Sequence, residues 1–278
     1  MSTTYICWCC CFVVVTSLAL AKHKGQPVIV GACSNLPMLV IFSLNGESLF
    51  SIIENVRIPG LSSTLVSLGV TGSGVVCHVG RRMAAYDIDF ALDKPRAHWV
   101  AHDTDVRSVA MAREANCVVS GSVGGEIALW DLRTLGSGKA SLSMKHGSTP
   151  VTAVAGLEKY SLISGGRDGT IQIWDTRFAT PSSKPIECGD SSAGNNKVIS
   201  LMPSIYCMTV GVTKDDGLYT IDIGSSAVDT ITVGDNKTVK LDHTAVVWAP
   251  GTNAEPTLAS MYVGSTKGVV NVWRTPAT

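Results

Sequence analysis

Several residues of this chain are of types that could do chemistry, and their spacing decides which chemistry is credible. His146 and Asp168 could form an acid–base pair, and residues 136–139 (Gly-Ser-Gly-Lys) resemble the end of a phosphate-binding loop. However, Ala140 stands where that loop needs a magnesium-binding Ser or Thr, and Arg133 stands where it needs its first Gly. The H-E-x-x-H motif of zinc peptidases is absent. We therefore predict no catalytic residue, no metal site and no cofactor.

Composition limits the partners that the chain could bind. Its 22 basic residues balance its 22 acidic residues, so no global field would gather nucleic acid or an acidic membrane surface. Charged residues make up 16% of the chain and the mean hydropathy is +0.26, with the apolar residues in short runs that suit half-buried strands. The nine cysteines are an odd number, and we interpret them as small buried apolar residues and not as a disulfide framework.

An internal repeat indicates which elements hold these residues. Its clearest copies are residues 121–133 (GSVGGEIALWDLR) and 165–177 (GGRDGTIQIWDTR), with a third at 264–274 (GSTKGVVNVWR). In each copy a Trp comes nine positions after a Gly, and apolar residues alternate before it. Alternation predicts a strand with one buried face, and the Gly and Asp residues predict a tight turn into that strand.

Weaker copies extend the repeat to six units. The residues at the aromatic position are Phe42, Tyr86, Trp130, Trp174, Ile221 and Trp273. The first four of these lie 44 residues apart, and the later intervals are 47 and 52. A short apolar strand with small residues in its middle precedes each unit, at 15–21, 65–71, 106–112, 151–157, 198–204 and 245–251. Small residues there favour strands that crowd around a central axis.

These units resemble the repeats of the WD-repeat family over nearly the whole chain, with a period of about 40–45 residues. The resemblance implies an all-β fold, a WD-repeat β-propeller with about six recognisable four-stranded blades, as a single domain over residues 1–278. The ring is either six-bladed, or seven-bladed with one blade degenerate or donated by a partner. That last case resembles small propellers of vesicle-coat and nuclear-pore scaffolds, which take strands from a neighbour.

In that family a His, a Ser or Thr, an Asp and the Trp form a hydrogen-bonded group within a blade. The matching residues here are His146, Ser164, Asp168 and Trp174, and they are expected to be structural. The preceding unit has His102, Ser120 and Trp130, but Gly124 stands at the position of the Asp. The last unit has His243 and Trp273, but Lys267 at that position.

The apolar run from residue 5 to residue 21 has three interpretations. A membrane-spanning helix needs about 20 residues, so the run is short for one. A secretory signal would explain Ala19-Leu20-Ala21 as a cleavage site, but no basic residue precedes the run. We favour strands, with residues 1–11 closing the ring as the outer strand of the last blade. The expected location is then intracellular, cytoplasmic or nuclear, and secretion is the alternative.

Arginines are the side chains that we expect to meet partners. Arg81, Arg82, Arg107 and Arg167 lie in or beside turns that should ring one face of a propeller, where Arg could anchor a peptide or a carboxylate. The alternative for each is an ordinary solvated turn residue.

A second set of arginines points to a particular class of partner. Residues 162–177 (LISGGRDGTIQIWDTR) resemble the sequence box of WD-repeat receptors in cullin-RING ubiquitin ligases, with Arg177 as its final Arg. Residues 118–133 are a second copy that ends in Arg133. The leading hypothesis is nevertheless a non-enzymatic scaffold subunit of a larger intracellular complex, which binds other protein subunits. The alternative hypothesis is a substrate receptor of such a ligase.

Overall fold

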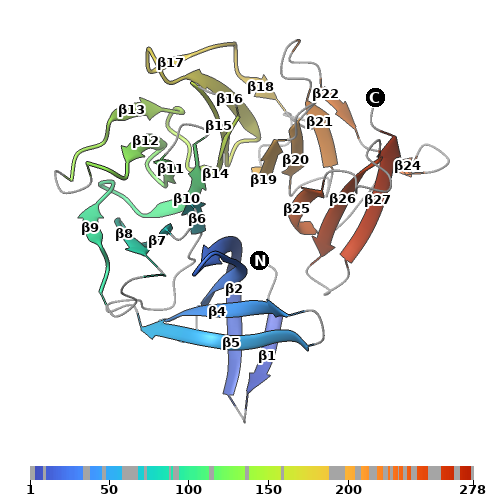
Figure 1. Cartoon of the computed structure of the whole chain (residues 1–278). Helices are drawn as coiled ribbons and strands as arrows, with labels where there is room; N and C mark the ends of the chain where they lie inside the picture. The colour runs from blue at the N-terminus through green and yellow to red at the C-terminus, as the bar shows by residue number, and fades with distance from the viewer. Residues whose placement is uncertain are drawn as a thin grey trace.

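Six antiparallel sheets follow one another around a common centre in the computed structural model of the chain (Figure 1). The structure describes all residues except 1–3, 9–10, 34–37, 46–47, 58–67, 72–73, 88, 90–93, 113–115, 135–137, 158–159, 188–197, 204–207, 213–217, 222–224, 226–227, 231, 234–236, 239–242, 250–257, 266–269 and 277–278. Within the described residues every regular element is a strand.

The strands follow one another in sequence order across each sheet. The first sheet contains β1 (Thr4–Trp8), β2 (Cys11–His23), β3 (Gln26–Cys33), β4 (Met38–Asn45) and β5 (Ser48–Arg57). The second contains β6 (Leu68–Thr71), β7 (Gly74–Val79), β8 (Arg82–Asp87) and β9 (Ala97–Val100). The third contains β10 (Val106–Met111), β11 (Cys117–Ser122), β12 (Glu126–Asp131) and β13 (Leu142–Lys145).

The second half of the chain repeats this plan. The fourth sheet contains β14 (Val151–Gly156), β15 (Ser161–Gly166), β16 (Thr170–Asp175), β17 (Thr180–Pro181) and β18 (Ile186–Glu187), with both β17 and β18 paired to β16. The fifth contains β19 (Val198–Pro203), β20 (Met208–Val212), β21 (Leu218–Ile221) and β22 (Val228–Thr230). A short pair, β23 (Thr232–Val233) and β24 (Lys237–Thr238), precedes the sixth sheet of β25 (His243–Ala249), β26 (Leu258–Ser265) and β27 (Val270–Pro276). We call the six sheets blades 1 to 6 in chain order.

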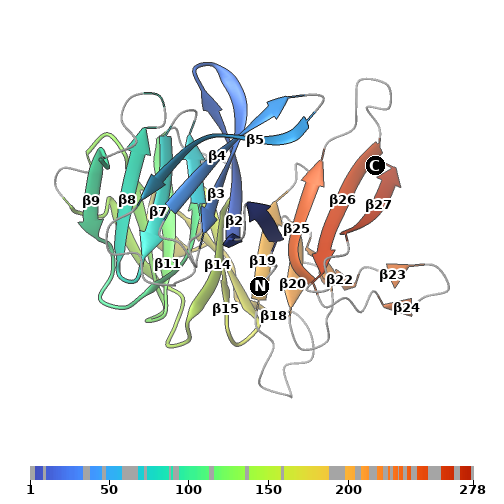
Figure 2. The same cartoon turned by 90° about the horizontal axis from the view of Figure 1, so that it is seen from below.

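The innermost strands are the small-residue segments that the sequence predicts. They are β2, β6, β10, β14, β19 and β25, and successive members of this series contact one another. Figures 1 and 2 show them around the centre, with the strands that follow each of them in its blade further out. The six residues at the aromatic position lie on β4, β8, β12, β16, β21 and β27. Each of these is the third strand of its blade when the inner strand is counted as the first. The prediction of a propeller with six recognisable blades is confirmed.

Five inner strands share an irregularity that the sequence pattern does not predict. The pairing register skips one residue near the start of the paired segment in each strand. The skipped residues are Thr16, Arg107, Thr152, Ile199 and Thr244. A bulge increases the local twist and redirects a side chain, so its recurrence helps each inner strand to turn away from its neighbour in the ring.

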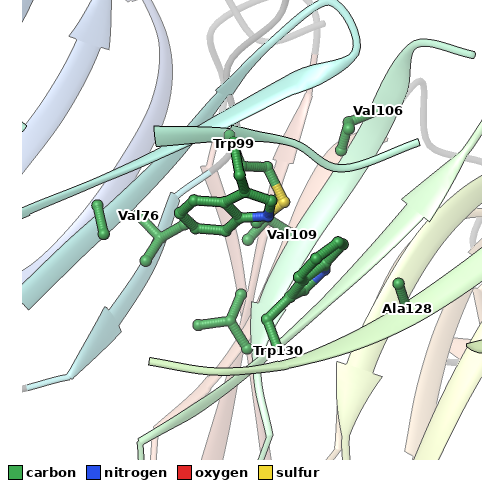
Figure 3. Packing of buried hydrophobic residues seen from close by; sticks show 9 residues of the cluster. Val76, Trp99, Val106, Val109, Ala128 and Trp130 are labelled. Atoms are coloured by element: carbon green, nitrogen blue, oxygen red, sulfur yellow. The ribbon is translucent and has the colours of Figure 1, made fainter. Parts of the chain in front are cut away.

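The core lies between neighbouring blades, because middle strands such as β11, β12, β15 and β16 bury both of their faces. One cluster between blades 2 and 3 centres on Trp99 and Trp130, whose ring centroids lie 5.6 Å apart (Figure 3). A second cluster between blades 3 and 4 centres on Trp174. Val118 belongs to the first cluster and Val119 to the second, as expected for successive residues of one strand.

The N-terminal segment pairs differently from the prediction. We expected residues 1–11 to form the outer strand of blade 6, beside β27. In the structure β1 instead forms a hairpin with β2, from Thr4 opposite Val15 to Trp8 opposite Cys11. A hairpin between adjacent segments closes a very short loop, whereas pairing with β27 would close a loop of almost the whole chain at a greater entropic cost. Within the described residues, blade 6 has three strands.

The contact between blades 3 and 4 predicts the effect of a substitution at Gly121. A Cβ added to Gly121 would come within 3.0 Å of Val154 Cγ1 on the inner strand of blade 4. We expect Gly121→Ala to lower the free energy of unfolding by about 1–3 kcal/mol, because the two blades would have to separate. Thermal unfolding checks this.

Gly138→Asn is the matched control for that substitution. A Cβ added to Gly138 would meet no atom within 4 Å, and the residue has a φ of +63°, which Asn tolerates. Its melting temperature should stay near that of the wild type. Equal melting temperatures for the two variants would contradict the packing argument.

Candidate functional site

A network of hydrogen bonds, buried at Trp174 and exposed at Asp168, links the four residues that the sequence groups in blade 4. Trp174 on β16 donates its indole N–H to Ser164 Oγ on β15, at 2.8 Å. Ser164 Oγ lies 2.7 Å from Nδ1 of His146, which directly follows β13. Asp168 lies in the turn between β15 and β16, but it reaches the imidazole through Thr170 and not directly. Thr170 Oγ1 is 3.0 Å from His146 Nε2 and donates to Asp168 Oδ1 at 2.7 Å.

The partners assign the proton positions in this chain. Ser164 accepts from the indole, so its single hydroxyl proton goes to His146 Nδ1. Thr170 gives its hydroxyl proton to Asp168, so it must accept a proton from His146 Nε2. His146 is therefore the neutral Nε2–H tautomer, and both of its ring nitrogens are paired within this network. Thr170 is a member that the sequence motif does not name.

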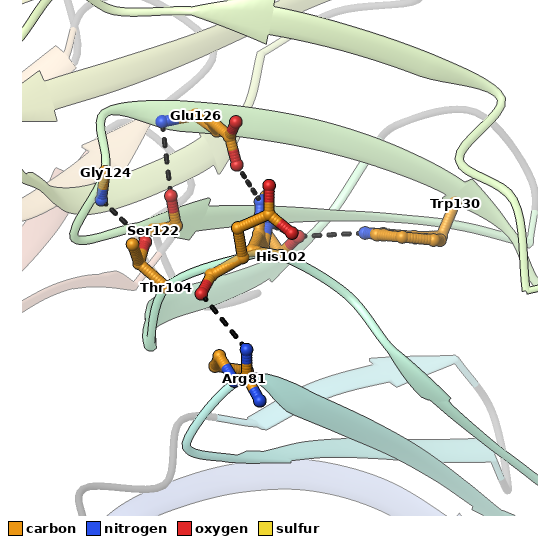
Figure 4. A network of polar contacts seen from close by, with 9 residues as sticks. Arg81, His102, Thr104, Ser122, Gly124, Glu126 and Trp130 are labelled. Atoms are coloured by element: carbon orange, nitrogen blue, oxygen red, sulfur yellow. Dashed lines mark hydrogen bonds and ion pairs between the residues drawn. The ribbon is translucent and has the colours of Figure 1, made fainter.

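Blade 3 builds the same chain with a different carboxylate. Trp130 donates to Ser120 Oγ at 2.8 Å, and Ser120 lies 2.8 Å from His102 Nε2. The other ring nitrogen, Nδ1, lies 3.4 Å from Glu126 Oε2 (Figure 4). The sequence predicts a missing acid here because Gly124 replaces the Asp. The structure supplies it two residues later, at the position that Thr170 occupies 44 residues downstream.

The atoms of Ser120, His102 and Glu126 are ordered as in a serine hydrolase triad, but they cannot act as one. A nucleophilic Ser needs an open path to its hydroxyl and a lone pair that faces the substrate. Ser120 is 0% exposed and its oxygen already accepts the Trp130 indole N–H. Burial lowers the pKa of both His102 and His146, which favours the neutral imidazoles that the bonding requires. The structural role that the sequence predicts for the group in blade 4 stays a prediction, and we expect the same role for the group in blade 3.

A third buried histidine lacks such a network. His78 on β7 is 2% exposed, and neither ring nitrogen has a hydrogen-bond partner. Burial, together with the nearby positive charge of Arg107, lowers its pKa to about 4. The neighbouring Cys77 is a buried thiol whose pKa burial raises to about 12, so it is unreactive at neutral pH.

The four arginines of the predicted partner-binding set are exposed and gather at one end of the blades. Arg81 and Arg167 lie in the turns that lead into β8 and β16, and Arg82 is the first residue of β8. Arg107 is the bulged residue near the start of β10. Arg81 donates from Nη1 to the carbonyl oxygen of Asp103, at 3.5 Å (Figure 4). Their use in binding remains a prediction.

The two arginines of the W-D-x-R motifs lie at the opposite end, just after β12 and β16. Each forms a bidentate ion pair, which we call a fork, in which Nε and Nη2 donate to the carboxylate of the Asp two residues earlier. The distances from Arg133 Nη2 to Asp131 Oδ2 and from Arg177 Nη2 to Asp175 Oδ2 are both 2.6 Å. These bonds lower the pKa of each Asp and raise that of each Arg. The arginine side chains are 68% and 57% exposed, so the forks present guanidinium groups to the solvent.

A shallow cavity of about 440 Å³ adjoins the blade 3 network. Its polar lining comes mainly from His102, Glu126, Ser143 and Lys145. Across the described part of the chain, no group of three or more His, Cys, Asp or Glu side chains could hold a metal ion. In the same residues, no helix has the length and apolarity that a membrane span requires.

The Glu126 contact gives a test of the blade 3 network. Glu126→Ala leaves the His102 Nδ1–H without its acceptor, and we expect a loss of about 1 kcal/mol in the free energy of unfolding. Gly124→Asp/Glu126→Thr recreates the residues of blade 4 and should recover most of that loss. Urea unfolding of the single and double variants measures both effects. A double variant no more stable than Glu126→Ala would show that the two networks are not interchangeable.

His78 predicts a pH dependence of stability. Its pKa is about 4 in the folded chain and near 6.5 when unfolded, so the unfolded state binds more protons as the pH falls. Stability should therefore be full above about pH 6.5 and fall by about 3 kcal/mol as the pH approaches 4. His78→Leu removes the titrating group and should flatten this part of the curve without loss at neutral pH. Thermal unfolding across this pH range checks it, and an unchanged acid slope in the variant would refute the assignment.

The comparisons with known proteins agree with this geometry. The model of the WD domain, G-beta repeat, matches residues 93–131 and 139–175, which contain most of blades 3 and 4. A chain of the crystal structure of the mitotic checkpoint complex superposes with a TM-score of 0.72 at 15% identity, over 95% of this chain and 75% of that one. At that identity the likeness shows the fold.

Two curated relatives match part of the chain. The Denticleless protein homolog of Danio rerio is 38% identical over 79 residues, which are 28% of this chain and 12% of that protein. The ribosome biogenesis protein YTM1 of Vanderwaltozyma polyspora is 25% identical over 101 residues, 36% of this chain and 21% of that protein. The matches thus span small parts of both relatives. With its repeats, its networks and its six blades, this chain contains WD repeats and has the β-propeller fold.

Proposed function

We propose that this chain is a non-enzymatic scaffold subunit of an intracellular multiprotein complex, cytoplasmic or nuclear. WD-repeat proteins generally mediate interactions between proteins. The observation that carries the proposal is that the networks inside blades 3 and 4 join their polar groups to one another, while charged turns are exposed at both ends of these blades. The two serines that could act as nucleophiles are buried and hydrogen-bonded, and the arginines that could bind a partner face the solvent.

The rigidity of the blades supports a binding role. Each network ties the two middle strands of a blade to the segment that enters from the previous blade. Because the Trp–Ser end of each network is buried, we expect the network to hold the turns of the blade in place before a partner binds. A preorganised surface loses less conformational entropy on association, which favours tight binding by a modest area.

A second candidate is a substrate receptor of a cullin-RING ubiquitin ligase. The resemblance of the W-D-x-R boxes suggested it, and such a receptor needs Arg133 and Arg177 exposed at the same end of neighbouring blades. Their matching forks and exposure meet that condition. The match to the Denticleless protein homolog and that to the ribosome biogenesis protein YTM1 are each too short to choose between the two candidates.

The edge of blade 6 is a further proposed contact. In the described residues this blade has three strands, with β27 at its outer side. An edge strand presents a row of backbone donors and acceptors that a partner's strand can pair with. We therefore also propose that a strand of a partner protein pairs with β27 and supplies the fourth strand of blade 6.

Purification of the native complex followed by mass spectrometry tests the function. The scaffold proposal predicts that other subunits co-purify in stoichiometric amounts, and that most of them remain with Arg133→Ala/Arg177→Ala. Lys94→Ala/Lys184→Ala is the control, since these exposed basic residues belong to neither arginine set. A cullin-RING adaptor that the first double variant loses and the control retains would favour the receptor. The absence of any stoichiometric partner would contradict both candidates.

A further inference from the structure

Blade 4 exposes a cluster of two aromatic side chains around an arginine. The guanidinium carbon of Arg177 lies 5.7 Å from the ring centroid of Tyr160 and 5.4 Å from that of Phe178. Phe178 is 69% exposed and Tyr160 is 39% exposed, so both are among the large apolar residues most open to solvent in the described chain. The three residues come from two turns at the same end of the blade, before β15 and after β16.

Blade 3 has the same two turns without the aromatic residues. Leu132 N bonds to the carbonyl of Asn116 at 2.8 Å, and Thr176 N bonds to the carbonyl of Tyr160 at 2.9 Å, so Asn116 and Tyr160 are equivalent. Thr134 occupies the place of Phe178, one residue after the fork arginine. The Asp–Arg fork itself is the same in both blades. The aromatic residues are therefore not needed to build the turn or the fork.

The backbone at Tyr160 makes an aromatic residue there locally unfavourable. Tyr160 has a φ of 67° and Asn116 a φ of 62°, both in the left-handed region. Asn occupies this region readily, whereas a bulky residue is an outlier in it. Ala179, next to Phe178, is a second left-handed residue, with a φ of 55°. Strained residues that the fold does not require are commonly found at functional sites.

The polar atoms of the cluster determine which partner would fit. Asp175 accepts three bonds, from the backbone N, Nε and Nη2 of Arg177. The hydrogen bonds among the described residues use Nε and Nη2 of Arg177 but not Nη1, and the side chain is 57% exposed. The surface thus combines apolar rings with hydrogen-bond donors of a cation. A carboxylate beside an apolar side chain complements both features, because charge-assisted bonds to Arg are strong and aromatic surface favours apolar contacts.

We propose that Tyr160, Arg177 and Phe178 form a docking surface for an acidic segment of a partner protein that also inserts an apolar side chain between or beside the rings. This rests on the proposed function, since it assumes that the chain works by binding proteins. The equivalent surface of blade 3 has the fork of Arg133 but lacks the rings. It does not bind the same segment.

A random-peptide phage library panned against the whole chain tests the chemistry of the partner. The probe variant is Tyr160→Asn/Phe178→Thr, which gives blade 4 the residues of blade 3 and serves for counter-selection. We expect peptides enriched on the wild type to carry Asp or Glu next to a bulky apolar residue. Their affinity, measured by fluorescence polarisation, should fall about tenfold or more in the variant. Enrichment of basic or purely polar peptides, or of peptides that bind both proteins equally, would overturn the proposal.

Stability measurements keep this test from being confused with misfolding. The double variant replaces a strained Tyr by Asn, so its melting temperature should equal or exceed that of the wild type. A clear fall in melting temperature would show that the rings serve the fold, which also overturns the proposal. The reciprocal variant, Asn116→Tyr/Thr134→Phe, should gain measurable binding to the selected peptides.

The outcomes separate this inference from the function on which it rests. If the native complex co-purifies in stoichiometric amounts with both the wild type and Tyr160→Asn/Phe178→Thr, and no acidic peptide is selected, the docking surface is wrong while the scaffold function stands. If no complex co-purifies with either protein, the proposed function itself fails.

Discussion

The hydrogen bond from a buried indole N–H to a buried serine is the contact on which blades 3 and 4 depend. Trp130 and Trp174 fill the spaces between blades, but an unpaired indole N–H in that position would cost free energy. The serine satisfies it and passes its own proton to a histidine from the incoming segment. In blade 3 and in blade 4, one hydrogen-bond network thus joins the two middle strands to the segment that enters from the previous blade. Packing supplies most of the stability, and the network selects one arrangement of the packed parts.

The two networks differ in how they end, which shows what such a network requires. Blade 4 ends on Asp168 through Thr170, and blade 3 ends on Glu126 directly. The common element is an acceptor that holds the second imidazole proton while the ring stays neutral. Any side chain that delivers an acceptor to that point can therefore serve, and the repeat tolerates the loss of its Asp at Gly124.

The repeat predicted the inner strands, and the resemblance to the WD-repeat family implied the propeller and the four residues that the motif names in blade 4. Thr170 and Glu126 were not predicted, since their role depends on the distance from the ring nitrogen and not on residue type at a motif position. The bulges were not predicted either, although three of the five bulged residues are Thr (Thr16, Thr152 and Thr244), because a register shift is visible only once the strands are paired. The N-terminal segment was predicted to pair with β27, but the shorter loop to β2 decided its place. The sequence did not single out Tyr160, because only the structure shows that Tyr160 and Asn116 share a left-handed backbone that suits Asn and not Tyr.

Blades 3 and 4 are expected to act as a rigid frame that presents turns to protein partners. Hydrogen–deuterium exchange of the chain, alone and within its purified complex, tests this most directly. We predict that exchange in β11, β12, β15 and β16 is slow in both states and hardly changes. Protection on complex formation should instead appear in exposed turns, foremost at residues 176–179 after β16. Protection spread through the strands, or none in the turns of any blade, would contradict a preformed binding frame.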